Sequence, residues 1–117
     1  WKEILKEKYT LETAEKLWDD TLEYHYEYTR DIKAGRKTFR PMRETFKETY
    51  EKLFPENDIS MDAILAVNIL FREHGNSSVY QDARDFFDQI TEEYRIWISS
   101  DTDLIMIQPL LTLFKQR

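Results

Sequence analysis

The chain has 117 residues, of which 41% are hydrophobic and 15% aromatic, and its formal net charge is −6. This length fits one domain of ordinary size, and the negative charge argues against nucleic-acid binding, which needs a basic surface to release counterions. The absence of cysteine excludes a disulfide framework and a thiolate metal site, and no apolar stretch reaches the roughly 18 residues that span a membrane.

Apolar residues recur at helical spacing from the first position onward, which predicts a helix over residues 1–8. Thr10 can accept a backbone N–H bond, so we expect it to cap a second helix that runs to about Ala34, where Gly35 ends it. The apolar face of this second helix steps by three and four residues through Leu11, Ala14, Trp18, Leu22, His25 and Ile32.

A basic loop, Arg36–Thr38, is expected to lead into a third helix. Pro41 fits the first turn of that helix, where its missing N–H costs nothing, and Pro55 closes the helix. The apolar residues that define it are Phe39, Met42, Phe46, Tyr50 and Leu53.

A fourth helix is expected from Met61 to about His74, with Ser60 as its cap and Gly75 as its end. This segment is apolar on almost all sides, which is typical of a helix buried among others.

A fifth helix is predicted from the capping-box pattern of Ser78 and Gln81. Its wide apolar face consists of Val79, Ala83, Phe86, Phe87, Ile90, Tyr94 and Trp97.

A sixth, strongly apolar helix follows the break at Ser99–Asp101, with Asp101 or Asp103 as its cap and Pro109 bending or interrupting it. No segment shows the alternation of a strand, so the sequence predicts an all-α fold. We expect an orthogonal or antiparallel bundle of about six helices that forms one domain over residues 1–117. Because the chain does not begin with Met, we also expect it to be part of a longer protein.

Residues that could perform catalysis or bind metals are scarce. His25 lies on an apolar helix face, so we expect it in the core, and His74 lies at a helix C-terminus, where its positive form favours the helix dipole. The sequence has no zinc or di-iron motif, no evident nucleophile and no glycine-rich phosphate loop. We therefore predict no catalytic residue, no metal site and no cofactor.

The carboxylates of the second helix raise one alternative, because magnesium-dependent all-α pyrophosphatases need acidic side chains on one helix face. Four such residues lie at spacings of three or four: Glu12, Glu15, Asp19 and Glu23. No second acidic cluster clearly pairs with them, so metal-dependent hydrolysis stays an alternative to binding.

Charged residues are gathered into two runs. The acidic run consists of Glu12, Glu15, Asp19, Asp20, Glu23 and Glu27. The basic run consists of Arg30, Lys33, Arg36, Lys37, Arg40 and Arg43. Such runs usually form solvated faces, and the alternative is a contact surface for a charged partner or an anionic membrane.

Four weak patterns of aromatic, apolar and cap residues follow one another over roughly residues 1–103. They are Trp1, Ile4, Leu5, Lys8, Tyr9 and Thr10; then Trp18, Thr21, Tyr24 and His25; then Phe46, Tyr50, Phe54, Pro55, Asp58, Ile59 and Ser60; and last Tyr80, Ala83, Phe87, Ile90, Trp97, Ile98 and Ser100. In order and spacing they resemble the regulator of G-protein signalling (RGS) homology domain.

This resemblance implies an RGS-like fold that binds a Gα subunit. Family members hold the switch regions of Gα in the transition-state shape for GTP hydrolysis, so the chemistry stays on the G protein. The family's contact positions fall on three groups of residues here, which are Glu12, Thr13 and Ala14; Asn57 and Asp58; and Glu92, Glu93 and Arg95. Thr13, Ala14 and Asp58 depart from the family's Glu-Asn pair and Asn, so we expect binding with weak or no GTPase activation.

We therefore interpret the chain as a protein-interaction module with no enzymatic activity of its own. It is expected in the cytoplasm, associated with a membrane through the rest of a larger signalling or trafficking protein. The alternative is a small acidic helical inhibitor or adaptor, of phage or bacterial type, that masks a basic surface on its partner.

Overall fold

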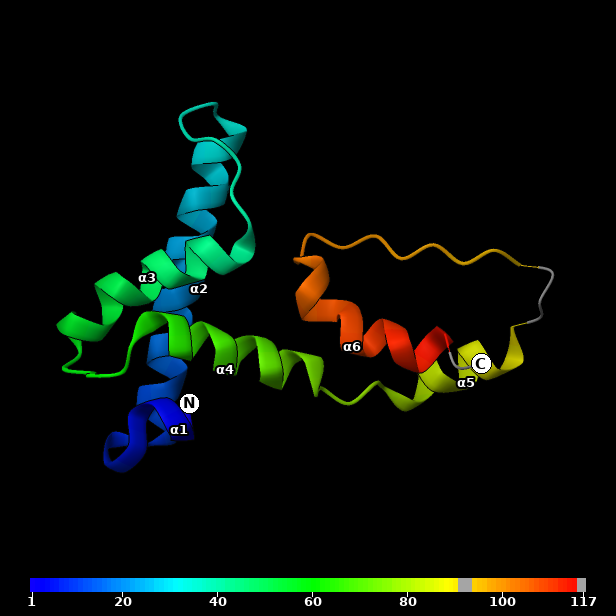
Figure 1. Cartoon of the computed structure of the whole chain (residues 1–117), viewed down its shortest axis with the longest axis horizontal. Helices are drawn as coiled ribbons and strands as arrows, with labels where there is room; N and C mark the ends of the chain where they lie inside the picture. The colour runs from blue at the N-terminus through cyan, green and yellow to red at the C-terminus, as the bar shows by residue number, and fades with distance from the viewer. Residues whose placement is uncertain (91–93, 116–117) are drawn as a thin grey trace. The chain divides into compact units, whose positions relative to one another are not determined.

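The computed structural model describes residues 1–90 and 94–115, with side chains as far as Thr112. These residues form six α-helices and one short 3-10 helix, and no strand occurs in the two described ranges (Figure 1). The helices are α1 (Lys2–Leu5), η1 (Lys6–Lys8), α2 (Leu11–Lys33), α3 (Met42–Glu56), α4 (Ala63–Gly75), α5 (Gln81–Gln89) and α6 (Leu104–Lys115). The predicted all-α fold with about six helices is confirmed.

Two compact units divide the chain, Trp1–Ile69 and Leu70–Arg117. The expectation of one domain over residues 1–117 stays a prediction. None of the described helices has the length and apolar character needed to cross a bilayer.

The helix predicted over residues 1–8 is divided into α1 and η1 at Lys6. Lys6 has a φ of 52°, which a continuous right-handed helix cannot contain. Ile4 and Leu5 are buried, so this short segment is held by its packing rather than by its length.

The limits of α2 were predicted correctly. The Thr10 hydroxyl accepts a hydrogen bond of 3.0 Å from the N–H of Thr13, which satisfies one of the free donors at the helix start. At the other end the helix stops at Lys33, and Gly35 follows with a φ of 71°, a left-handed conformation that glycine adopts without strain.

The buried face of α2 differs from the predicted one. Ala14, Leu17 and Thr21 are buried, whereas Leu11, expected in the core, is 65% exposed in the first turn. Neither Leu17 nor Thr21 was predicted. Thr21 can be buried because its hydroxyl donates a 2.6 Å hydrogen bond to the Leu17 carbonyl one turn earlier.

Helix α3 packs against α2 and supplies the aromatic core of the first unit. Tyr50, only 1% exposed, lies between Phe54, at 4.9 Å between ring centroids, and Phe46, at 6.2 Å. The Trp1 ring meets Tyr50 edge-on at 6.1 Å, which joins the N-terminus to this core. The predicted core positions Phe46, Tyr50 and Leu53 are therefore confirmed.

The start of α3 lies later than expected. Pro41 directly precedes the helix instead of standing in its first turn, and Phe39 lies outside it with 76% of its surface exposed. Pro55 lies in the last turn, one residue before the helix ends at Glu56.

The cap of α4 is Asp62 and not Ser60. An Asp62 carboxylate oxygen accepts hydrogen bonds from the N–H groups of Ile64, at 2.9 Å, and Leu65, at 3.2 Å. The helix therefore begins at Ala63 instead of Met61. The expected all-round burial is also wrong, because Ile64 and Leu65 are 46% and 56% exposed.

The second unit departs most from the sequence prediction. Helix α5 begins at Gln81 after Tyr80 with no side-chain cap, so the capping box of Ser78 and Gln81 is wrong. The helix ends at Gln89, because Ile90 has an extended backbone. Its predicted extension through Tyr94 and Trp97 is wrong too. Both residues lie in non-helical chain, and Trp97 is 87% exposed.

Helix α6 runs through Pro109 without ending there. Gly75, the last residue of α4, passes so close to Pro109 that a Cβ atom at position 75 would lie 3.0 Å from the proline ring. Phe71 and Met106 are the buried hydrophobic side chains of this unit among the described residues.

The two leucines at the start of α2 test which face of the helix is buried. We expect Leu17→Ala to lower the free energy of unfolding by about 2–5 kcal/mol, because it removes a buried side chain and leaves a cavity. Leu11→Ala, the matched control, should change it by less than about 0.5 kcal/mol. Urea unfolding followed by circular dichroism measures both, and equal losses would contradict the observed face.

Candidate functional site

The first predicted partner-binding group lies at the start of α2. Glu12 is exposed there. Thr13 is half-buried, and its hydroxyl lies 2.7 Å from that of Thr10 within the helix cap. Ala14 is buried, so its side chain cannot meet a partner in this fold. Glu12 is therefore the residue of this group with a side chain free to form contacts.

The second predicted group lies where α3 ends. The Asn57 side chain donates a 2.8 Å hydrogen bond to the Leu53 carbonyl and so completes the helix terminus. Asp58 is exposed and has a φ of 53°, a left-handed conformation that Asp tolerates better than most residues. Asp58 is therefore the member of this pair that faces outward.

A single hydrogen bond brings these two groups together. The Lys8 ammonium donates to the Asp58 carbonyl oxygen at 2.6 Å, across 50 positions of sequence. Lys8 is two residues before the Thr10 cap, so the start of α2 is held beside the connection from α3 to α4. A hollow of about 90 Å³ lies between Ile4–Lys8 and Asp58–Met61. We call the exposed residues of Glu7–Glu12 and Asn57–Ser60 the Lys8–Asp58 surface.

The third predicted group belongs to the second unit. Glu92 and Glu93 lie outside the described residues. Arg95 is exposed and lies in no helix.

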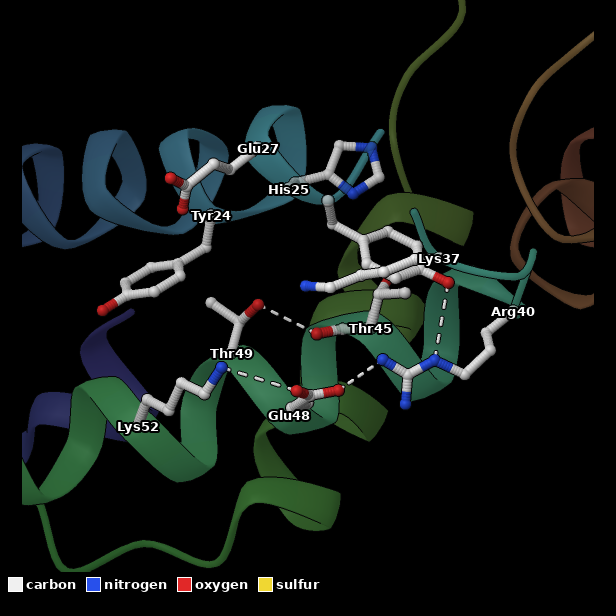
Figure 2. A pocket seen from close by; sticks show the side chains of 10 residues that line it. Tyr24, His25, Glu27, Lys37, Arg40, Thr45, Glu48, Thr49 and Lys52 are labelled. Carbon is white, nitrogen blue, oxygen red and sulfur yellow. Dashed lines mark hydrogen bonds and ion pairs between the residues drawn. The ribbon is translucent and has the colours of Figure 1, made fainter. Parts of the chain in front are cut away.

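A second candidate site is a pocket of about 80 Å³ in the first unit, between α2, the segment that precedes α3, and α3 itself (Figure 2). Cationic, acidic, hydroxyl and aromatic side chains line it: Tyr24, His25, Glu27, Tyr28, Lys37, Arg40, Thr45, Glu48, Thr49 and Lys52. Sequence reasoning did not identify this pocket.

Arg40 and Glu48 form the centre of a polar network in this pocket. The Arg40 guanidinium pairs with the Glu48 carboxylate and donates through Nε to the Tyr28 hydroxyl at 3.4 Å. Lys52 lies 3.4 Å from the other Glu48 oxygen (Figure 2). The hydrogen bond from Arg40, more than that from Lys52, lowers the pKa of Glu48 below its ordinary value. Glu48 is therefore an anion that two cations share.

Two tyrosines on α2 support these cations. The Arg40 guanidinium lies 5.3 Å from the Tyr28 ring centroid and the Lys37 ammonium 5.6 Å from it, while Lys52 lies 5.7 Å from the Tyr24 ring. Such contacts hold a cation over the electron-rich face of a ring. The pocket therefore combines cations and aromatic faces with two carboxylates, Glu27 and Glu48, of which Glu48 is bound by Arg40 and Lys52.

His25 lines the same pocket and is half-buried. Its ring stacks on that of Phe46 from α3, with centroids 5.5 Å apart and planes 6° from parallel. Burial lowers the pKa of His25 below its ordinary value, which favours the neutral ring. The contact is a packing interaction between α2 and α3.

An acidic groove of about 340 Å³ lies next to this pocket on the same helix pair and shares Tyr24 and Glu27 with it. Four carboxylates and two larger side chains line it: Asp20, Glu23, Tyr24, Glu27, Leu53 and Glu56. Within the described ranges no three His, Asp or Glu side chains are grouped closely enough to hold a metal ion.

No protein-family model matches this chain, and no curated protein or solved structure shows significant similarity to it.

The lowered pKa of His25 predicts a pH-dependent stability. The pKa of His25 is lower in the folded chain than in the unfolded chain, so between these two values the unfolded chain binds more protons. Stability therefore rises with pH in this range and is lost as the pH falls below about 6.5. His25→Phe keeps a stacking ring without the titration. We expect this variant to lose less stability than the parent chain between pH 7 and pH 5, measured as the shift in urea midpoint. An identical shift in both proteins would contradict the prediction.

Proposed function

We propose that this chain is a protein-interaction module that contacts its partner through the Lys8–Asp58 surface. The observation that carries the proposal is the hydrogen bond from Lys8 to the Asp58 carbonyl. It joins two segments, far apart in sequence, that the resemblance to RGS domains assigns independently to partner contact.

The α3–α4 connection on this surface is rigidly held, which suits a contact loop. The N–H of Ile59 donates a hydrogen bond to the Phe54 carbonyl at 2.8 Å, and the N–H of Asp58 donates one to the Pro55 carbonyl at 3.3 Å. The Ile59 side chain, within this connection, is buried and anchors it. A loop that is ordered before binding loses little conformational entropy when its partner arrives.

The resemblance makes a Gα subunit the first partner to test. In that reading this chain would hold the switch regions of Gα, and GTP hydrolysis would take place wholly within the G protein. Asp58 stands where the family has Asn, so a carboxylate replaces an amide at the centre of the surface. Asp can accept hydrogen bonds there but cannot donate them as an amide does.

Restoring the amide gives a gain-of-binding test. Asp58→Asn keeps a residue that tolerates the left-handed backbone and supplies the family's donor, so we expect about fivefold tighter binding to Gα. The measurement is titration of the full chain against a panel of Gα subunits with GDP and aluminium fluoride. Asp19→Asn is the control, because it makes the same charge change at an exposed position on α2, outside the Lys8–Asp58 surface.

Single-turnover GTP hydrolysis in the same panel distinguishes binding from activation. Binding without acceleration supports a scaffold role. If no Gα binds to either the parent chain or Asp58→Asn, Gα is excluded as the partner.

The acidic groove favours a second candidate function, the masking of a basic surface. Asp20, Glu23, Glu27 and Glu56 line it beside the apolar parts of Tyr24 and Leu53. Lysine and arginine side chains combine a cationic end with an apolar stem, so they suit such a groove.

A lysine-rich peptide tests this second candidate by calorimetry. We expect Glu23→Gln with Glu27→Gln to weaken peptide binding by about tenfold at low salt, because exposed charges act through screened attraction. The control, Glu12→Gln with Glu15→Gln, removes the same charge from the first turns of α2, outside the groove. If the two pairs of substitutions have equal effects, only the net charge matters and the groove is not a site.

A further inference from the structure

The end of α2 and the connection to α3 carry a positive charge that is opposite to that of the whole chain. Residues 30–43, which we call the basic tip, contain six Lys or Arg residues and one acid, Asp31, so their formal charge is +5 in a chain of −6. The connection lies at the end of α2 away from the N-terminus (Figure 1). Even with the neighbouring Glu27, Glu44 and Glu48 included, the balance stays positive.

Ion pairs leave much of this charge unmatched. Asp31 is shared by Arg36, at 2.7 Å, and Lys37, at 3.4 Å, so one carboxylate faces two cations. Arg30 and Lys33 are exposed, and neither forms an ion pair with any described residue. Cations in this state are available to an external anion.

The first four carboxylates of the acidic run, Glu12, Glu15, Asp19 and Asp20, lie too far along α2 to cancel the charge of the basic tip. A rise of 1.5 Å per residue places Asp20 about 20 Å from Lys33 along the axis. At physiological ionic strength the screening length is about 8 Å, so most of the negative charge is hidden from a surface that meets the tip.

Phe39 gives the tip an apolar side chain in the middle of these charges. It is 76% exposed and lies in non-helical chain between Lys37 and Arg40. An exposed aromatic residue between cations costs stability in water and contributes nothing to binding of a soluble anion through charge. The same pair of features is typical of segments that rest at the boundary between lipid headgroups and acyl chains.

The connection is also held in place, so Phe39 does not have to be ordered on binding. The Tyr28 hydroxyl donates a 2.8 Å hydrogen bond to the Thr38 carbonyl, next to Phe39. Lys37 and Arg40, which flank it, both lie over the Tyr28 ring. The backbone on either side of Phe39 is therefore fixed against α2.

We propose that the basic tip docks on an anionic phospholipid membrane, with Phe39 inserted at headgroup level and the surrounding Lys and Arg side chains bound to lipid phosphates. This contact is independent of the proposed protein-binding surface, which lies at the opposite end of α2. It anchors the chain peripherally and requires no spanning segment.

Sedimentation of the full chain with vesicles tests the apolar part of the contact. We expect binding to phosphatidylcholine vesicles that contain about 30% phosphatidylserine, and little binding to pure phosphatidylcholine. Phe39→Ala should weaken binding by about tenfold, because it removes the inserted ring. Leu11→Ala removes another exposed apolar side chain, at the other end of α2, and should have no effect on vesicle binding.

The charge contribution is tested in the same vesicles. Lys33→Gln with Lys37→Gln should weaken binding by about 25-fold, at roughly fivefold for each cation near an anionic surface. Lys2→Gln with Lys6→Gln makes the same charge change at the N-terminus and should leave binding nearly unchanged.

A fluorescent label identifies which end of the helix meets the lipid. Because the chain has no cysteine, Thr38→Cys and Glu15→Cys each provide one labelling site for a polarity-sensitive dye. We expect anionic vesicles to shift the emission to the blue at position 38 and not at position 15. Absence of vesicle binding would overturn the proposal. The proposal would also be overturned if Phe39→Ala bound the anionic vesicles as tightly as the parent chain does and both proteins bound heparin equally well. The basic tip would then be a site for soluble polyanions.

Discussion

The stacking of His25 on Phe46 and the burial of Leu17 and Thr21 join α2 to α3, and the other features of the first unit depend on this contact. The pocket of Figure 2 is formed because the two helices lie together with the Lys37–Arg40 segment across them. The acidic groove uses side chains from the same pair. Separating α2 from α3 would therefore remove both hollows at once, whatever each of them binds.

Local chemistry made some boundaries predictable, since Thr10 and Gly35 act on their own neighbours and the structure uses both as expected. The buried face of α2 was less accessible to sequence reasoning. Thr21 is a polar residue, so its burial is not expected from the sequence. It can be buried because its hydroxyl donates a hydrogen bond to the Leu17 carbonyl of its own helix. The predicted fifth helix is longer than α5, because the helical spacing of apolar residues continues past Ile90. The backbone nevertheless leaves the helical conformation at Ile90.

The candidate sites depend on pairings between residues that are distant in sequence, and spacing carries no information about those. Lys8 meets the carbonyl of Asp58 across 50 residues, a bond that no side-chain pattern could indicate because its acceptor is backbone. Arg40 was recognised as part of a basic run, but its pairing with Glu48 and its support by Tyr28 follow from the approach of α3 to α2. The resemblance to RGS domains indicated contact residues in two segments, and these two segments lie together in the structure. The burial of Ala14, by contrast, could be known only from the structure.

Charges on α2 are unevenly distributed along its length: six carboxylates and Lys16 lie before Thr29, whereas Arg30, Lys33 and the single carboxylate Asp31 lie at its end. This order is the stable one, because the carboxylates lie toward the positive end of the helix dipole and the cations at its negative end. The side-chain charges oppose the backbone dipole and, being several full charges, outweigh it. Helix α2 therefore has an acidic part and a basic end. Near a charged surface the first unit experiences a torque before any contact is made, and the sign of that surface decides which end of α2 arrives first.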